Sequence, residues 1–215
     1  MHWLTGIMRP GLDTTNMREK TMKSIRLFLA LTMIAGSAPM VAHADGTLQI
    51  NVAPFTSEVD IKEKIRKQLE GGGMEWGIAG NRMVVTTVNK QYVAPAINQL
   101  TRFGTNVTQS LPAGEYTISC VAMVYDGGMS VAKVLSKGAF FNENVMTFRI
   151  EEGQTTTLDI RPVIRKTGGL IKIFMPEYLT TATLNGEKSA EVSLNSRSEK
   201  SIGWDDYNGD LKFKK

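Results

Sequence analysis

Histidine and cysteine are the two residue types that this 215-residue chain most nearly lacks. Both histidines, His2 and His43, lie in the first 44 residues, and Cys120 is the only cysteine. Without an imidazole, residues 45–215 cannot build a Ser-His-Asp triad, a Cys-His pair or an ordinary zinc site. This composition excludes most hydrolase classes. We expect a protein that is not an enzyme, with no catalytic residues, no cofactor and no metal site.

A single cysteine also excludes an internal disulfide bond, so the hydrophobic core must stabilise the fold. Hydrophobic residues make up 42% of the chain, which suffices for a core at this length. Cys120 alternates with Ile118 and Ala122 on one face of a predicted strand. We interpret it as a buried structural thiol, and the alternative is pairing with a cysteine of another chain.

Excess charge of one sign is lacking after residue 44. The whole chain has 25 basic and 21 acidic residues, but the first 44 residues hold five of the basic and two of the acidic ones. Residues 45–215 therefore carry 20 basic and 19 acidic groups, a formal net charge of +1. A nearly neutral segment, whose basic cluster is confined to Lys212, Lys214 and Lys215, argues against nucleic acid as a partner.

Long apolar runs are scarce, and the run near the N-terminus has the pattern of a secretory signal peptide. Residues 22–44 combine a basic start, a short apolar run and the ending Ala42-His43-Ala44. The run is too short to cross about 30 Å of hydrocarbon, and the alanines fit the rule for signal peptidase. We expect cleavage between Ala44 and Asp45, a location in the periplasm or outside the cell, and no stable membrane anchor. A retained anchor is the alternative.

Residues 1–21 precede this pattern and contain three methionines. We interpret them as an extension from a wrongly assigned upstream start codon, with Met17 or Met22 as the true initiator.

Residues 45–106 have the pattern of a strand, a helix and a strand. Residues 48–52 alternate apolar and polar side chains, as in a strand with one buried face. The next segment predicts a helix capped by Ser57, because apolar residues recur every fourth position from Ile61 to Leu69. Residues 82–89 are rich in β-branched side chains and predict a strand. Pro95 could then begin a second, short helix that ends at Gly104.

Residues 107–178 predict the core of a β-sandwich, because short strand patterns alternate with turn residues. The predicted strands are 115–125, 129–136, 146–150, 156–160 and 169–175. The turn 151–153 is expected to join two partner strands. We predict a mainly β fold, an antiparallel β-sandwich with one N-terminal helix, and an α+β fold is the alternative.

Residues 179–215 are more polar and predict a hairpin followed by a tail. Asn185-Gly186 supplies the positive φ angles of a type I′ turn between residues 180–184 and 187–194. The last residues either pair as an edge strand near Leu211 and Phe213 or extend as a free tail.

The segments LPAGEYTI at 111–118 and FRIEEGQTT at 148–156 resemble bacterial envelope domains of the transthyretin-like and Ig-like kind, among them the PEGA group. The resemblance covers about residues 107–175. It implies a sandwich fold. It implies no activity, because the glycine and tyrosine of such a turn serve turn geometry and packing.

By elimination, we hypothesise an exported, soluble binding protein of the bacterial envelope that acts by protein–protein contact, as an assembly factor, an inhibitor or an immunity protein. One alternative is a carbohydrate-binding module, which needs a row of exposed aromatic side chains on one sheet face. The other is a carbohydrate-active enzyme with two carboxylates about 5 to 10 Å apart in a cleft. The adjacent acids Glu151-Glu152 and Asp205-Asp206 would point to opposite faces of a strand, so we interpret them as surface residues.

Five residues are candidate partner-binding positions. Trp204 and Tyr207 could stack on a ligand or anchor a partner protein. Leu170, Lys172 and Phe174 lie on a predicted edge strand to which a partner chain or a second copy could add a strand, in competition with residues 179–215. The alternative is a closed monomer whose tail pairs permanently with that edge.

Overall fold

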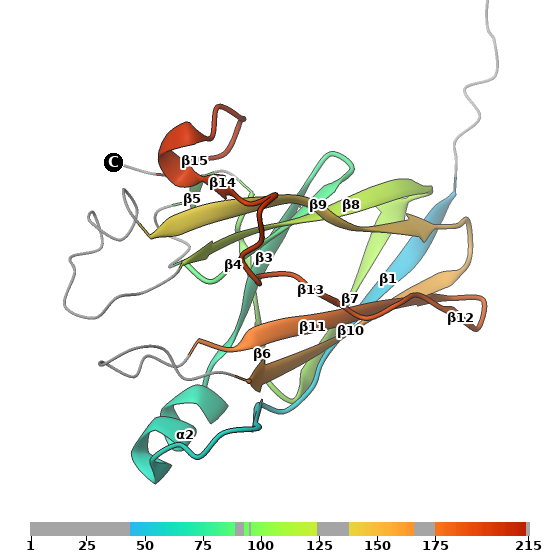
Figure 1. The fold of residues 1–215 in the computed structure, drawn as a ribbon. Coiled ribbons are helices and arrows are strands. Elements are labelled where there is room, and N and C mark those ends of the chain that lie inside the picture. The colour runs from blue at the N-terminus through green and yellow to red at the C-terminus, as the bar shows by residue number, and fades with distance from the viewer. Residues whose placement is uncertain (1–43, 89–92, 95, 124–137, 166–174, 214–215) are drawn as a thin grey trace, which may run out of the picture. The chain divides into compact units, whose positions relative to one another are not determined.

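Two β-sheets packed against each other dominate the structure, a computed structural model that describes residues 44–88, 93–94, 96–123, 138–165 and 175–213 (Figure 1). The first sheet, sheet A, contains β1 (Asp45–Val52), β2 (Thr56–Ser57), β7 (Thr105–Pro112), β10 (Thr155–Ile164), β11 (Glu177–Leu184), β12 (Glu187–Lys188) and β13 (Val192–Ser193). The second, sheet B, contains β3 (Gly73–Ala79), β4 (Arg82–Thr86), β6 (Gln99–Arg102), β8 (Gly114–Met123), β9 (Ala139–Ile150) and β14 (Ile202–Gly203). The predicted mainly β, sandwich-like class with one N-terminal helix is confirmed.

The sheets are mixed, so the expectation of a purely antiparallel sandwich was wrong. The order in sheet A is β12-β11-β10-β1-β7, and in sheet B it is β14-β9-β8-β4-β3-β6. Strand β1 pairs in parallel with β10, and β4 pairs in parallel with β8. The parallel pairs arise because the chain crosses between the sheets instead of folding each strand back on its predecessor.

The turn at residues 151–153 illustrates such a crossing. We expected it to join partner strands, but β9 ends in sheet B and β10 begins in sheet A. Gly153 has a φ of +67°, and its N–H donates to the carbonyl of Asp45 at 3.2 Å. The turn thus rests on the start of β1, and the apolar faces of β9 and β10 meet the same core from opposite sides.

The main core lies between the sheets. Leu48, Ile50 and Val52 of β1 are almost fully buried there, and Trp76 and Ile118 of sheet B belong to the same cluster. Burial of each such side chain stabilises the folded state by about 1.5–3 kcal/mol relative to leaving it exposed to water. Cys120 is in this cluster and fully buried, as predicted, and burial raises the pKa of its thiol.

Sheet B is buried on its other face as well. Val84, Val121 and Phe141 form a second apolar cluster with Leu211 and Ile97. Strands β4, β8 and β9 therefore contain continuous buried runs, whereas β1 and β10 of sheet A alternate buried and half-buried residues. The polar face of sheet A is the face on which a binding site can form.

Helix α2 (Glu63–Glu70) covers one end of the sandwich, where Ile65 and Leu69 pack near Phe55 and Ile164. It begins later than predicted, and Ser57 is not its N-cap. Ser57 pairs with Ile164 in the sheet, and its hydroxyl donates to the carbonyl of Val59 at 2.7 Å.

The second helix expected after Pro95 was wrong, since residues 99–102 form β6 and pair with β3. The buried Trp76 indole donates to the Thr101 hydroxyl at 2.9 Å, a contact that the sheet position of Thr101 provides.

The C-terminal segment pairs with both sheets. Strands β12 and β13 pair with β11, and β14 pairs with β9. A short 3₁₀ helix, η2 (Trp204–Asp206), follows, and β15 (Lys212–Phe213) pairs with β5 (Val93–Ala94). No helix within the described residues is long and apolar enough to cross a membrane. Leu170, Lys172, Phe174 and the predicted signal peptide up to His43 lie outside the described residues.

Candidate functional site

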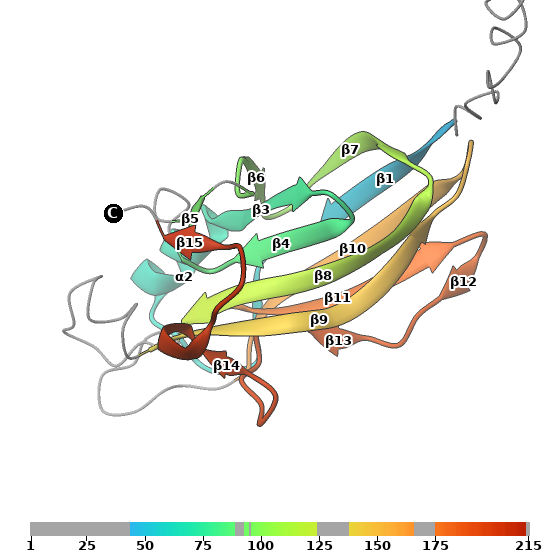
Figure 2. The same ribbon diagram turned by 90° about the horizontal axis from the view of Figure 1, so that it is seen from above.

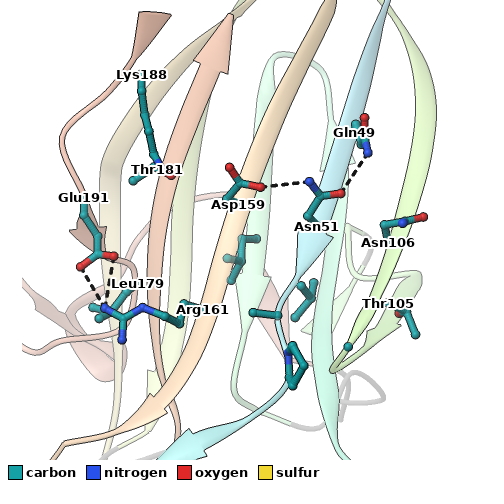
Figure 3. A pocket seen from close by; sticks show the side chains of 15 residues that line it. Gln49, Asn51, Thr105, Asn106, Asp159, Arg161, Leu179, Thr181, Lys188 and Glu191 are labelled. Atoms are coloured by element: carbon teal, nitrogen blue, oxygen red, sulfur yellow. Dashed lines mark hydrogen bonds and ion pairs between the residues drawn. The ribbon is translucent and has the colours of Figure 1, made fainter. Parts of the chain in front are cut away.

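A polar groove of about 620 Å³ crosses the outer face of sheet A (Figure 3). Its walls come from β1, β7, β10, β11 and β12 and from the adjoining loops. The polar lining side chains are Gln49, Asn51, Thr105, Asn106, Asp159, Arg161, Thr181, Lys188 and Glu191. No aromatic side chain is among the described residues that line it.

Strand register brings these residues together. Asn51 is the direct partner of Asn106 on β7 and of Asp159 on β10, and Asp159 is the partner of Thr181 on β11. The four side chains therefore form a cross-strand row on one sheet face. On β1 and β10 the neighbours of Asn51 and Asp159 along the strand are buried core residues, which fix this face outward.

Hydrogen bonds orient the centre of the groove. The Gln49 amide donates to Asn51 Oδ1 at 3.0 Å, and Asn51 Nδ2 donates to Asp159 Oδ1 at 2.9 Å (Figure 3). All three side chains are half-buried. Because Asn51 is held at both ends of its amide, the direction of the row is set before any ligand arrives.

Formal charge in the groove is balanced. Arg161 donates to both carboxylate oxygens of Glu191 at 3.3 Å, which joins β10 to the segment before β13. Asp159 and Lys188 are the other charged lining residues. The groove thus offers fixed hydrogen-bonding groups of both signs, as suits a polar ligand without a strong net charge.

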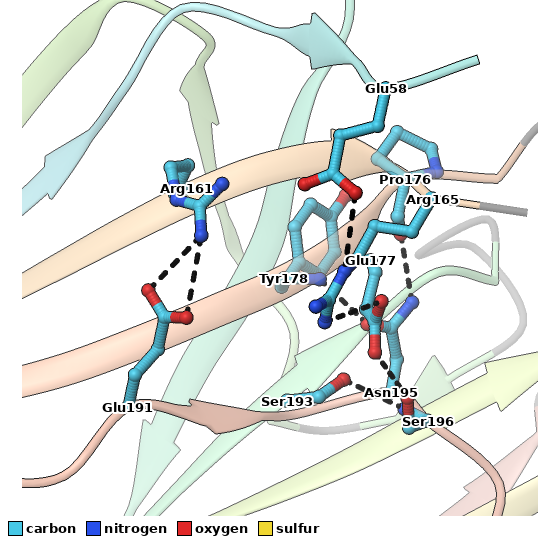
Figure 4. A network of polar contacts seen from close by, with 10 residues as sticks. All are labelled: Glu58, Arg161, Arg165, Pro176, Glu177, Tyr178, Glu191, Ser193, Asn195 and Ser196. Atoms are coloured by element: carbon cyan, nitrogen blue, oxygen red, sulfur yellow. Dashed lines mark hydrogen bonds and ion pairs between the residues drawn. The ribbon is translucent and has the colours of Figure 1, made fainter.

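A second polar network holds the C-terminal segment beside the groove (Figure 4). Asn195 accepts a hydrogen bond from the Tyr178 N–H and donates to the Pro176 carbonyl, both at 2.8 Å, and so replaces missing strand contacts at the start of β11. Arg165 lies 3.7 Å from Glu58 and 3.6 Å from Glu177, and Ser196 donates to Glu177.

The Glu177 carboxyl responds to these neighbours. Partial burial alone would raise its pKa, but hydrogen bonds from Ser196 and Ser193, with the Arg165 guanidinium nearby, hold the pKa below the usual value. Glu177 is therefore a structural carboxylate that stays ionised near neutral pH. A general acid would need a raised pKa instead.

Trp204 and Tyr207 do not line the groove. They stack on each other with ring centroids 5.2 Å apart, and Tyr207 packs on Phe141 at 4.4 Å. Both side chains are half-buried against the outer face of sheet B. The structure thus gives them a packing role, and their contact with a partner stays a prediction.

The described residues contain no group of three or more His, Cys, Asp or Glu side chains that could hold a metal ion. Asp159 and Glu191 line one groove, but Asn51 holds the first and Arg161 the second. Neither carboxylate is presented as an unpartnered acid or base.

The local sequence pattern does not identify the groove residues. Alternation marked the outward positions of β1 and β10, which include Gln49, Asn51 and Asp159. The row exists only because strands that are distant in sequence become neighbours, and nothing in the local pattern indicates that adjacency.

Comparisons with protein-family models, with curated proteins and with solved structures found no match to this chain, so the argument for function rests on the geometry of sheet A.

Proposed function

We propose that this chain is an exported binding protein of the bacterial envelope, located in the periplasm or outside the cell, that contacts another protein through the groove of sheet A. The observation that carries the proposal is the hydrogen-bond chain Gln49–Asn51–Asp159, which holds polar groups in place on an outer sheet face. Export is supported by the leader pattern at residues 22–44 and by the start of β1 at Asp45, directly after the expected cleavage site.

Protein–protein contact is favoured over the two carbohydrate alternatives. A carbohydrate-binding module uses exposed aromatic rings, whereas the described lining of the groove has none. A carboxylate-dependent enzyme needs one acid kept protonated, whereas in the described part of the chain the carboxyls whose pKa is displaced, Glu177 and Asp210, are both shifted downward. Amides, hydroxyls and paired charges are the groups that polar protein surfaces recognise.

Site-specific photo-crosslinking in the producing cell tests this proposal. A photoreactive amino acid replaces Lys188, an exposed residue on the groove wall. We expect a covalent adduct with another envelope protein. Adding Asn51→Ala should reduce the adduct yield at least tenfold, because the loss of an oriented hydrogen bond to a charged group costs about 1.5–3 kcal/mol.

The matched control places the same amino acid at Glu199, which is exposed but does not line the groove. Equal adduct yields at positions 188 and 199, or a yield that Asn51→Ala leaves unchanged, would contradict the proposal. Retention of the purified chain on insoluble envelope polysaccharide without any protein adduct would favour a carbohydrate ligand.

A further inference from the structure

Strand β7 forms one edge of sheet A, beyond β1 (Figure 2). All eight of its residues, Thr105–Pro112, pair with β1 in one uninterrupted antiparallel register. Among the described residues no other strand pairs with β7. Its second side therefore presents main-chain groups to whatever lies beside the sheet.

The hydrogen bonds of β1 show which groups these are. The Thr47 N–H donates to the turn before β10, and the N–H of Ala53, which directly follows β1, donates to β10. The main-chain groups of the odd-numbered residues of β1 therefore point toward β10. The intervening β1 residues face β7, where their register partners are Thr105, Val107, Gln109 and Leu111. Among the remaining β7 residues, Asn106, Thr108 and Ser110 direct their main-chain groups to the free edge, whereas the Pro112 carbonyl accepts from the Tyr116 hydroxyl.

The usual protections of a sheet edge are nearly absent from β7. It contains no charged residue and no break in register, and its one proline, Pro112, stands at the end. The other outermost strands in the described part of the chain are shorter: β2, β5, β12, β13, β14 and β15 have two residues each, and β6 has four and carries Arg102. An uncharged eight-residue edge is the kind that accepts another strand.

We propose that β7 pairs with β7 of a second copy of this chain, antiparallel and about a two-fold axis at Thr108. If the two-fold axis is perpendicular to the sheet, the side chains of two residues that pair across it lie on the same sheet face. Each pair must therefore combine two even-numbered or two odd-numbered residues of β7. Centring on Thr108 opposes Thr108 to itself and Asn106 to Ser110 of the second copy. These outward-directed residues then exchange about six main-chain hydrogen bonds.

The chemistry of the strand favours a second copy over an unrelated strand. Thr108, Asn106 and Ser110 are all exposed, short and uncharged, so self-pairing produces Thr–Thr and Asn–Ser contacts without like-charge repulsion. They provide no charged or aromatic anchor that could select the side chains of a different sequence, although Asn106 also lines the groove on the outer face of sheet A. Pro112 lies outside this ladder, and its missing N–H leaves no unpaired donor at the end.

Cysteine crosslinking of the full exported chain tests the register. In Thr108→Cys the two thiols of a dimer lie across the axis, where paired Cα atoms are about 5.5 Å apart, so dibromobimane should link them. Asn106→Cys alone should not be linked, because its two thiols would be separated by about 13 Å along the strands. A mixture of Asn106→Cys and Ser110→Cys should be linked. The parent chain is the blank, since Cys120 is fully buried.

Charge substitution at the axis gives a second readout by sedimentation. Thr108→Lys and Thr108→Glu should each be monomeric, and their equimolar mixture should recover the dimer. Thr108 does not line the groove, so failure of the charged variants would leave the proposed function unaffected. The proposal would be overturned by a parent chain that is monomeric at all concentrations. It would also be overturned if Asn106→Cys were linked in place of Thr108→Cys, or if the charged substitutions at Thr108 left the dimer intact. A monomer that uses β7 to bind a strand of another protein would overturn it as well.

Discussion

Tyr116 links the two sheets at the scale of a single residue. Its hydroxyl donates to the Pro112 carbonyl at 2.9 Å, across the bend between β7 and β8, and its ring stacks on Phe148 with centroids 5.5 Å apart. Burial, with a smaller effect from Asp45, raises the pKa of its phenol. The bend L-P-x-G-x-Y is thus closed by a tyrosine that packs with its ring and bonds with its hydroxyl.

We predict that Tyr116→Phe lowers the free energy of unfolding by about 1 kcal/mol. The ring contacts remain, but the partly buried Pro112 carbonyl loses its donor. Urea denaturation should show a lower midpoint with an unchanged slope.

Tyr207→Phe is the matched control. The Tyr207 hydroxyl makes a long, exposed contact of 3.4 Å with Asp210 and a hydrogen bond with the Leu211 backbone at the surface, so its removal should cost less than removal of the Tyr116 hydroxyl. Equal losses of unfolding free energy in the two variants would contradict a stabilising role for the hydrogen bond between Tyr116 and Pro112.

At the scale of elements, the hairpin between β11 and β12 follows from two residues. Asn185 and Gly186 have φ angles of +52° and +82°, as the predicted type I′ turn requires, and Leu184 pairs with Glu187 across it. Sequence was sufficient here because the conformational freedom that the turn needs belongs to the turn residues themselves.

We predict that Gly186→Ala destabilises the fold by about 1–2 kcal/mol, because an L-side chain is strained in this left-handed conformation. No atom lies within 4 Å of the added Cβ, so the cost is conformational and not steric. Thermal unfolding measures it.

Gly71→Ala is the control for that variant. Gly71 has a φ of −77°, and the nearest atoms to an added Cβ are 3.7 Å away, so alanine fits there. Its melting temperature should stay equal to that of the parent or rise slightly. If both variants melted alike, backbone strain at Gly186 would not explain the loss.

Residues 97–103, predicted as a short helix, contain strand β6 instead. Their apolar spacing suits either a short helix or a strand, and the decision came from β3, whose register places Thr101 beside Met74 and within reach of Trp76. Short apolar segments are ambiguous because tertiary contacts outweigh their weak local preference.

At the scale of the whole molecule, ionised carboxylates attach the C-terminal segment to the sandwich. Asp210 accepts from Arg82 at 2.5 and 2.6 Å, and this hydrogen bond, against a smaller effect of burial, lowers its pKa. Glu177 is also shifted downward, and Ser196 donates to it. Both groups bind protons more weakly in the folded chain than in the unfolded chain.

We therefore predict that stability falls on acidification. Because the pKa of each carboxyl is lower in the folded chain, its contribution to the free energy of unfolding is fully present above the unfolded-state pKa of about 4. That contribution disappears as the pH falls through the lowered folded-state pKa. Each contribution is expected to be at most about 1 kcal/mol, because the carboxylate of Asp210 is largely exposed and salt screens the pair. Urea midpoints measured from pH 7 to pH 2 should show the loss.

Asp210→Asn supplies the comparison. It should be less stable than the parent at pH 7 and should lose less stability on acidification, with the two curves converging at low pH. Parallel curves would mean that Asp210 contributes nothing to the acid dependence.

Local sequence was sufficient wherever the deciding interaction lies within a few residues. Alternation located β1 and the strands around Cys120 and Phe148, and Asn185-Gly186 located a turn. Composition excluded imidazole chemistry after residue 44. These inferences succeeded because side-chain period and turn preference are properties of short segments.

Packing between distant segments decided the rest. It placed β9 and β10 in different sheets, made β1 and β10 parallel neighbours, and left β7 at an edge. The groove follows from those choices, because Asn51, Asn106 and Asp159 come from three strands separated by more than fifty residues of sequence. Strand order and register minimise exposure of the shared core, a quantity that no single strand carries in its own pattern.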